Sequence, residues 1–215
     1  MPAAGELAIP LDHDSVDEAR LVAAALAGSQ AAFERIVVRY QRPVLSLLVR
    51  LTGDRALAEE LAQDTFVKAF RSLSAFDTSR RLSSWLFRIA HNAGIDALRR
   101  ASTAHHKPVS RTAAEALPSD LPAPPQADPV ERRALGDAIQ EAFSRLRPDQ
   151  RSAIVLRYEE GLPFEDIARI LGIAEATARS HVHRARRQLA QMLSEAGWHP
   201  ADGPQRATPA LRKPE

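Results

Sequence analysis

Residues 163–191 restrict the fold of this chain most, because two different helical patterns meet there. Apolar residues at helical spacing predict a short helix over 163–171, and Gly172 follows where the chain must turn sharply. A second predicted helix starts near Glu175, and its inward apolar stripe, at steps of four and three, consists of Ala178, Val182, Ala185, Leu189 and Met192. Ala168 and Gly172 are small enough for the two helices to cross closely. The pattern therefore predicts a helix-turn-helix.

The second of these helices has two unlike faces. The apolar face can pack on the first helix, and the opposite face carries cations and hydroxyls that can donate to guanine edges and phosphates in a DNA major groove. A basic amphipathic helix is also typical of a solvated or membrane-surface helix. The close crossing favours DNA binding. The outward side chains are Arg179, Ser180, His181, His183, Arg184, Arg186 and Arg187.

Composition predicts a helical protein without disulfides. The chain has 215 residues, of which 45% are hydrophobic and only 5% aromatic, and runs of β-branched residues are scarce. There is no cysteine, which excludes disulfides and thiolate metal sites. No apolar run reaches membrane-spanning length, and the N-terminus is acidic rather than signal-like. We therefore expect a cytoplasmic protein that is not inserted in a membrane.

The prolines divide the chain. Twelve of the 15 fall in the two ends or in 101–130, which leaves two regions that can form helical bodies. Charge also varies along the chain: residues 1–29 carry one arginine against five acids, whereas 30–100 carry twelve Lys/Arg against seven acids. A basic body suggests an anionic partner. The predicted organisation is an arm (1–16), a first body (17–100), a Pro/Ala-rich flexible linker (101–130), a second body (131–193) and a flexible tail (194–215).

Helical periodicity fills both bodies. In the first body we expect Phe70 and Trp85 to face inward, and Pro43 to kink or split its helix. The helices predicted besides the helix-turn-helix are Asp17–Ala27, Gln30–Leu51, Arg55–Leu73, Ser83–Arg100, Glu131–Leu146 and Asp149–Tyr158.

One face of the helix predicted over 83–100 carries Arg88, Asn92 and Arg99, at spacings of four and seven. An arginine-bearing loop precedes it. Such a row suits contacts to a nucleic-acid backbone and bases. A solvated helix face explains the same pattern equally well, so the residues alone leave the two interpretations open.

Three motifs in order resemble the extracytoplasmic-function (ECF) group of sigma-70 family RNA polymerase sigma factors. AEELAQDTFVKAF (58–70) resembles region 2.2, WLFRIAHNAGIDALRR (85–100) resembles regions 2.3 and 2.4, and 146–186 resembles region 4. The resemblance implies an all-α fold of two small domains, a region 2 helical bundle and a region 4 helix-turn-helix. It also implies that the chain binds core polymerase, directs it to promoters and helps to melt the −10 region.

Site residues follow from the resemblance by position. The polymerase-binding set, expected on the β′ clamp helices, is Glu59, Glu60, Leu61, Gln63, Asp64 and Phe66. The set for the −10 non-template strand is Asp77, Arg80, Arg81, Arg88, Asn92, Asp96 and Arg99. The set for the −35 duplex is Thr177, Arg179, Ser180, His181, His183, Arg184 and Arg187. Other implied partners are the polymerase β flap and an anti-sigma factor.

The chain departs from the family pattern at a few positions. Ala176, Ala178 and His181 stand where the family usually has glycine, a β-branched residue and arginine, and Ala62 stands where a larger aliphatic residue is common. A histidine titrates near pH 6.5, whereas an arginine stays charged. The departures bear on the preferred −35 sequence rather than on the mode of binding.

The sequence carries no pattern that favours catalysis or metal binding. No phosphate loop, nucleophile elbow or catalytic His/carboxylate pair is present, and His181 and His183 diverge on a helix, so we expect no catalytic residue, cofactor or metal. A helix-turn-helix regulator with a helical sensor domain is the alternative, and a helical enzyme is a distant third. Such a regulator would bind duplex DNA without polymerase, and it would not need motifs 58–70 and 85–100.

Overall fold

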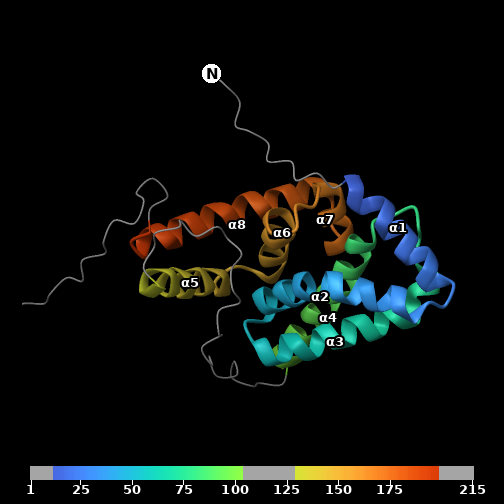
Figure 1. The fold of residues 1–215 in the computed structure, drawn as a ribbon. Helices are drawn as coiled ribbons and strands as arrows, with labels where there is room; N and C mark the ends of the chain where they lie inside the picture. Colours follow the sequence, from blue (N-terminus) through green and yellow to red (C-terminus); the bar gives the residue numbers. More distant parts are fainter. Residues whose placement is uncertain (1–11, 104–128, 199–215) are drawn as a thin grey trace, which may run out of the picture.

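The computed structural model describes residues 12–103 and 129–198, and those stretches are helical without a strand (Figure 1). This confirms the predicted all-α class. The described residues form eight α-helices and one short 3-10 helix, in this order: α1 (Asp12–Leu26), α2 (Gln30–Thr52), α3 (Arg55–Ser72), η1 (Leu73–Ala75), α4 (Leu82–Thr103), α5 (Pro129–Ser144), α6 (Pro148–Tyr158), α7 (Phe164–Leu171) and α8 (Glu175–Glu195).

The first body is a bundle in which α2, α3 and α4 contact one another and α1 covers α2. Capping residues explain where two of these helices start: the Ser29 side chain accepts from the backbone of α2, and Asp54 accepts from that of α3. Helix α1 is also tied to α4, because a Glu18 carboxylate oxygen accepts from the Leu82 backbone N–H at 3.0 Å. The Tyr40 hydroxyl donates to the same carboxylate. Glu18 thus supplies the cap at the start of α4.

The close approach of α2 and α4 depends on Gly94. A Cβ at this position would lie 2.5 Å from Leu51 Cδ2 and 3.3 Å from Leu48 Cδ2, both on α2. Leu48 and Leu51 are fully buried, so the space is already filled. Pro43 lies inside α2, and that helix continues through it to Thr52 without a split.

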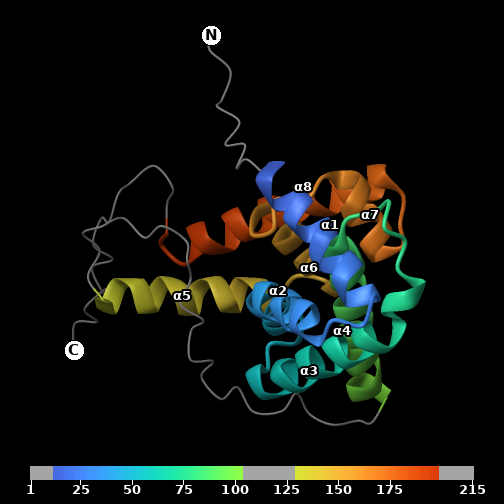
Figure 2. The ribbon, with the colours of Figure 1, turned by 45° about the vertical axis from the view of Figure 1, so that its right-hand side comes forward.

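The second body consists of α5 to α8. Helix α8 contacts α5, α6 and α7, and α5 runs beside it in both ribbon views (Figure 2). Gly172 ends α7 in the left-handed region at φ +67°, which a glycine adopts without a Cβ penalty. The chain then enters α8, so α7 and α8 form the predicted helix-turn-helix.

The two bodies pack against each other, which the sequence patterns did not predict. Helix α7 contacts α4, and α6 contacts α2. One continuous apolar cluster includes Leu47 and Phe87 of the first body together with Val155 and Ile167 of the second. The molecule is therefore held by a shared core, at least as far as the described helices are concerned.

Two local predictions were wrong. Helix α1 starts at Asp12 rather than Asp17. Phe70 is exposed instead of inward, because Phe66 and Ala69 already fill the inner face of α3. Trp85 faces inward as expected: it is half-buried, packs against the core and lies beside Phe76, with a centroid distance of 5.2 Å and a tilt of 49° between the rings.

Some predictions fall outside the described residues. Most of the arm (1–11), most of the linker (104–128) and most of the tail (199–215) are among them. Within the helices that the structure describes, none is both long and apolar enough to cross a membrane.

Candidate nucleic-acid interface

Helix α8 presents a cationic face to solvent because its other face is fixed in the core. Ala178, Val182 and Ala185 are buried, at steps of four and three. Their small volume lets α8 lie close to α6 and α7. Six of the seven residues predicted for the −35 duplex lie on the opposite face and are exposed: Thr177, Arg179, Ser180, His183, Arg184 and Arg187.

The seventh residue, His181, is half-buried. Its Nδ1 atom is buried without a hydrogen-bond partner among the described residues. His181 therefore lies at the edge of the exposed face rather than at its centre.

Arg179 is already engaged, unlike Arg184. An Arg179 guanidinium nitrogen lies 2.6 Å from a Glu175 carboxylate oxygen, and the guanidinium carbon lies 4.6 Å from the ring centroid of Phe164. Sequence reasoning missed this aromatic partner, although Phe164 follows Pro163 at the start of α7. Within the described part of the chain, Arg184 and Arg187 form no ion pair, so their donors face solvent.

The residues predicted for the −10 strand divide into two groups. Asp77, Arg80, Arg81 and Arg88 line one cavity of about 190 Å³, together with Phe76 and Trp85. Asn92, Asp96 and Arg99 lie exposed on the following turns of α4. An Arg99 nitrogen lies 3.7 Å from an Asp96 carboxylate oxygen.

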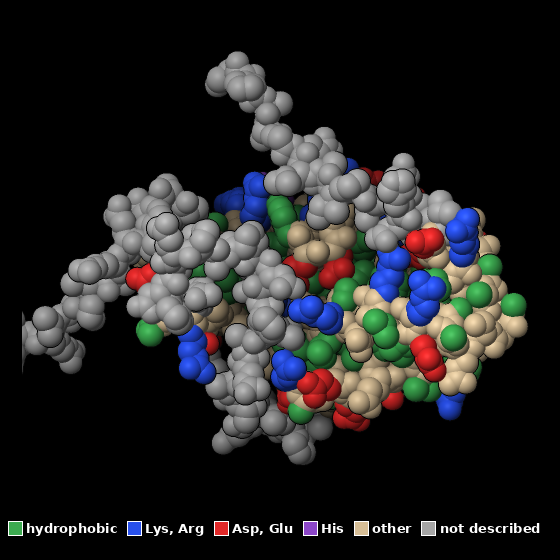
Figure 3. Space-filling model, in the orientation of Figure 1, with side chains coloured by type: hydrophobic (Ala, Val, Ile, Leu, Met, Phe, Trp, Pro, Cys, Tyr) green, Lys and Arg blue, Asp and Glu red, His purple; other side chains and the backbone are tan. Residues whose placement is uncertain are grey.

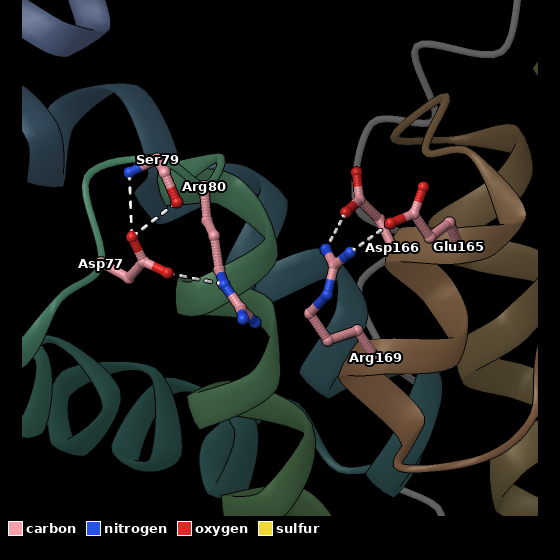
Figure 4. A network of polar contacts seen from close by, with 6 residues as sticks. All are labelled: Asp77, Ser79, Arg80, Glu165, Asp166 and Arg169. Carbon is pink, nitrogen blue, oxygen red and sulfur yellow. Dashed lines mark hydrogen bonds and ion pairs between the residues drawn. The ribbon is translucent and has the colours of Figure 1, made fainter.

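The loop before α4 is organised by Asp77 (Figure 4). One carboxylate oxygen accepts from the Ser79 backbone N–H at 3.0 Å and from the Ser79 hydroxyl at 2.6 Å. The other oxygen accepts from Arg80 Nε at 2.9 Å. These hydrogen bonds from Ser79, and to a smaller extent those from Arg80, lower the pKa of Asp77 below its ordinary value. The aspartate stays charged and aligns Arg80 at the cavity.

Helix α3 carries the residues predicted to bind polymerase, and it divides them by burial. Glu59, Glu60, Gln63 and Asp64 are exposed. Leu61 and Phe66 belong to the buried core, so they support α3 and do not reach its surface. The exposed acids form one polar face of the bundle.

Two apolar side chains extend the α3 surface, and sequence reasoning missed them. Phe70 is 60% exposed and Val67 is 48% exposed. The Phe70 ring meets Phe33 of α2 edge-on at a centroid distance of 5.0 Å. Apolar side chains reach the surface among charged ones over the α2 and α3 part of the molecule (Figure 3). The available signal in the sequence was the size of Phe70, because the inner face of α3 has no room for a large aromatic beside Phe66 and Ala69.

Both helical bodies match known families. The sequence model of Sigma-70 region 2 matches residues 36–104, and that of Sigma-70 region 4 matches residues 136–189. The match boundaries place α4 inside region 2, and α7 and most of α8 inside region 4. The first body is therefore region 2 and the second body is region 4.

Whole-chain relatives agree with these matches. The RNA polymerase sigma factor CarQ of Myxococcus xanthus is 39% identical over 171 residues, which cover 78% of this chain and 92% of CarQ. The ECF sigma factor SigW of Bacillus subtilis is 32% identical over 173 residues, covering 78% of this chain and 92% of SigW. The chain belongs to the ECF group of sigma-70 family RNA polymerase sigma factors.

A solved structure shares the arrangement of the helices. The sigma factor RpoE of Bartonella quintana, solved with the anti-sigma factor NepR, superposes with a TM-score of 0.61 at 28% identity, over 75% of this chain and 96% of that one. The family assignment makes this protein a DNA-binding transcription factor that acts with RNA polymerase in promoter recognition and transcription initiation.

Proposed function

We propose that three surfaces divide the work of this sigma factor. The acidic face of α3 binds the β′ clamp helices of core polymerase, the loop 77–81 with α4 binds the −10 non-template strand, and the outer face of α8 reads the −35 duplex. The chain itself performs no catalysis, and it works in the cytoplasm, where the polymerase supplies the chemistry.

The exposed face of α8 is the observation that carries this proposal. A recognition helix needs one face packed against the protein and free hydrogen-bond donors on the opposite face. Ala178 and Ala185 fix the inner face, and Arg184 and Arg187 supply donors that form no ion pair with a carboxylate of the described residues. Duplex recognition through guanidinium groups follows from this arrangement.

The cavity before α4 supports a role for region 2 with an open strand. Melting requires unstacked bases to be held by the protein, because strand opening costs energy. Trp85 offers aromatic surface beside the buried Phe76, and Arg80, Arg81 and Arg88 offer cations around one cavity. Asn92, Asp96 and Arg99 extend the surface along α4.

The α3 face supports polymerase docking by its charge. Glu59, Glu60 and Asp64 present carboxylates in solvent, which suit a basic partner. The exposed Phe70 adds an apolar anchor beside them. The Bartonella relative was solved with an anti-sigma factor, so we also propose an anti-sigma protein as a partner of this chain.

Run-off transcription tests the function directly. Purified chain is added to sigma-free core polymerase with a library of genomic fragments, and transcripts are mapped. Defined start sites that need the chain are the expected result. Specific duplex binding without any polymerase-dependent start would instead favour the alternative, a helix-turn-helix regulator with a helical sensor domain.

Charge reversal tests the docking face. Glu60→Arg with Asp64→Arg should abolish co-purification with core polymerase and leave the helical circular dichroism spectrum unchanged. Asp137→Arg, on the exposed surface of α5, is the matched control and should bind as the unmodified chain does. Unchanged binding of the double variant would remove α3 from the docking role.

A further inference from the structure

We propose that Glu18 of α1 is a positioning residue for the −10 strand: it caps α4 and thereby fixes the loop 77–81 and the start of α4 around the cavity. The inference rests on the proposed role of this cavity in binding the −10 strand. Helix α1 lies beside the start of α4 in the ribbon view (Figure 2). The match to Sigma-70 region 2 begins at residue 36, so Glu18 lies outside the matched residues.

The start of α4 carries no capping side chain of its own. The first N–H groups of a helix have no partner within that helix and need an acceptor from elsewhere. Arg81 directly precedes α4 and accepts from the Trp85 backbone N–H through its carbonyl oxygen at 3.4 Å, but an arginine side chain has no acceptor atom. The first turn of α4 contains no acidic residue either. The Leu82 N–H therefore takes its acceptor from another element.

Glu18 supplies this acceptor across 64 positions of sequence. One carboxylate oxygen accepts from the Leu82 backbone N–H at 3.0 Å, and the other accepts from the Tyr40 hydroxyl. Leu82 and Tyr40 are buried and Glu18 is half-buried, so these hydrogen bonds are shielded from water. A carboxylate at this place also meets the positive end of the helix dipole. Glu18 thus does for α4 what Ser29 and Asp54 do for α2 and α3.

The capped end of α4 carries most of the cavity. The loop 77–81 is exposed throughout, and the hydrogen bonds of Asp77 lie within the loop, so the position of the loop depends on its two ends. At one end Phe76 is buried, and at the other the Leu82 N–H is held by Glu18. The residues of the loop and of the first two turns of α4 that line the cavity are Asp77, Arg80, Arg81, Ser84, Trp85 and Arg88.

Loss of the cap should weaken −10 binding although it removes a negative charge. Glu18→Ala raises the net charge by one unit, and by charge alone this change would tighten binding to a polyanion. Without the cap, the start of α4 frays, and the guanidinium groups around the cavity have to be ordered again when the strand binds, at a cost in entropy. The positioning role therefore predicts the opposite sign from the charge effect.

Hydrogen exchange of the full chain tests the cap without DNA. Glu18→Ala should accelerate exchange of the backbone amides in the peptide 77–85 by roughly fivefold, and leave exchange in α8 unchanged. Asp54→Ala is the matched control, because it also removes a carboxylate cap, which accepts from the Leu57 backbone N–H at the start of α3 at 3.1 Å. It should leave the peptide 77–85 unchanged. Unchanged exchange of this peptide in Glu18→Ala would overturn the cap.

DNA binding is then compared by fluorescence anisotropy, with a −10 non-template oligonucleotide and a −35 duplex from a promoter mapped by run-off transcription. Glu18→Ala should bind the oligonucleotide roughly fivefold more weakly and the duplex within about twofold of the unmodified chain. Asp54→Ala changes the net charge equally and should stay within about twofold on both. Glu18→Gln keeps an oxygen that can accept from the Leu82 N–H and should recover most of the affinity. Equal weakening by Glu18→Ala and Asp54→Ala would overturn the positioning role.

The two measurements separate this inference from the proposed function. If the unmodified chain does not bind the oligonucleotide, the proposed role of the cavity fails and the positioning role fails with it, whereas hydrogen exchange still shows whether Glu18 caps α4. If the unmodified chain binds and Glu18→Ala binds equally well, only the positioning role fails. Tyr40→Phe removes the hydroxyl that donates to Glu18, and it should weaken oligonucleotide binding less than Glu18→Ala does. A larger loss in Tyr40→Phe would overturn Glu18 as the positioning group.

Discussion

The two proposed DNA surfaces differ in the parts of the chain that build them. In region 4, the outer face of α8 comes from one helix, which is backed by small buried side chains. In region 2, the cavity lined by Arg80, Arg81 and Arg88 is also lined by Arg169 of α7, and the loop 77–81 is exposed. The surface proposed for duplex DNA is thus formed by region 4 alone, whereas the cavity proposed for the melted strand has walls from both regions.

The contrast extends to packing. Region 2 brings α2 and α4 together at Gly94 with no spare volume. In region 4, Gly136 of α5 has nothing within 4 Å of a built Cβ. The first region therefore tolerates added volume less than the second, and this difference can be measured.

The largest effect is expected at Gly94. Gly94→Val would push a β-branched side chain into Leu51 and Leu48, and we expect a loss of about 3 kcal/mol in the free energy of unfolding. Urea unfolding followed by circular dichroism measures it. Gly136→Val is the matched change on α5 and should change the free energy of unfolding by less than about 1 kcal/mol, because nothing lies within 4 Å of a Cβ built there. Equal tolerance at both positions would contradict the packing contrast.

The next effect concerns the end of α6. Burial, with a smaller contribution from the neighbouring Glu159, raises the pKa of Glu160 from 4.5 to about 7. The folded chain therefore favours the protonated form. Stability from this preference is fully present below pH 4.5 and is lost as the pH rises through 7.

Glu160→Gln keeps a neutral side chain at every pH. We expect it to stabilise the fold by about 2 kcal/mol at pH 8, since the side chain is partly screened by solvent, and to have little effect at pH 4.5. Unfolding free energies at the two pH values measure the difference. Asp137→Asn, on an exposed turn of α5, is the control and should show no such dependence on pH.

A smaller effect compares two arginines on α8. Arg184→Ala should lose about 1–2 kcal/mol of discrimination between the preferred −35 duplex and a scrambled one. Arg179 is held by Glu175 and Phe164, so Arg179→Ala should lose less than about 1 kcal/mol. Competition binding with the two duplexes measures both. Equal weakening on every sequence would make Arg184 a phosphate contact instead.

Local patterns in the sequence predicted most of the helices and the direction of the α8 stripe. Ala178, Val182 and Ala185 were placed inward by spacing alone, because an apolar stripe of helical period marks the face that the neighbouring helices cover. The periodicity of α3 placed Phe70 inward, although a third helix leaves room there only for Ala69. Spacing within one helix cannot report how much space its neighbours leave.

Spacing within a helix could not predict the contact between the two regions either, because that contact joins residues of different helices. His91 and Ser152 lie on different helices and are 61 positions apart in the sequence. The pattern around each indicates only a polar residue on an inward face. The Arg81–Asp166 contact likewise joins charged residues of two different regions, and the pattern around neither residue indicates the other as its partner. Only the three-dimensional arrangement shows that region 4 completes the cavity proposed for −10 DNA.

The smallest effect is expected on mild acidification, and it acts at this contact. Desolvation lowers the pKa of His91, against a smaller opposing effect of Asp149. The folded chain thus favours the neutral imidazole, which meets the Ser152 hydroxyl. This stability is present above pH 6.5 and is lost as the pH falls below it.

Between pH 6.5 and 5.5 one histidine can change the free energy of unfolding by no more than about 1.4 kcal/mol, and we expect a loss below that limit. Urea unfolding at the two pH values should show the loss in the unmodified chain and a smaller loss in His91→Gln, which does not titrate. His183→Gln, on the exposed face of α8, should behave as the unmodified chain does. If His91→Gln loses as much stability as the unmodified chain, the acid sensitivity arises elsewhere, and the buried contact between α4 and α6 does not depend on the charge of His91.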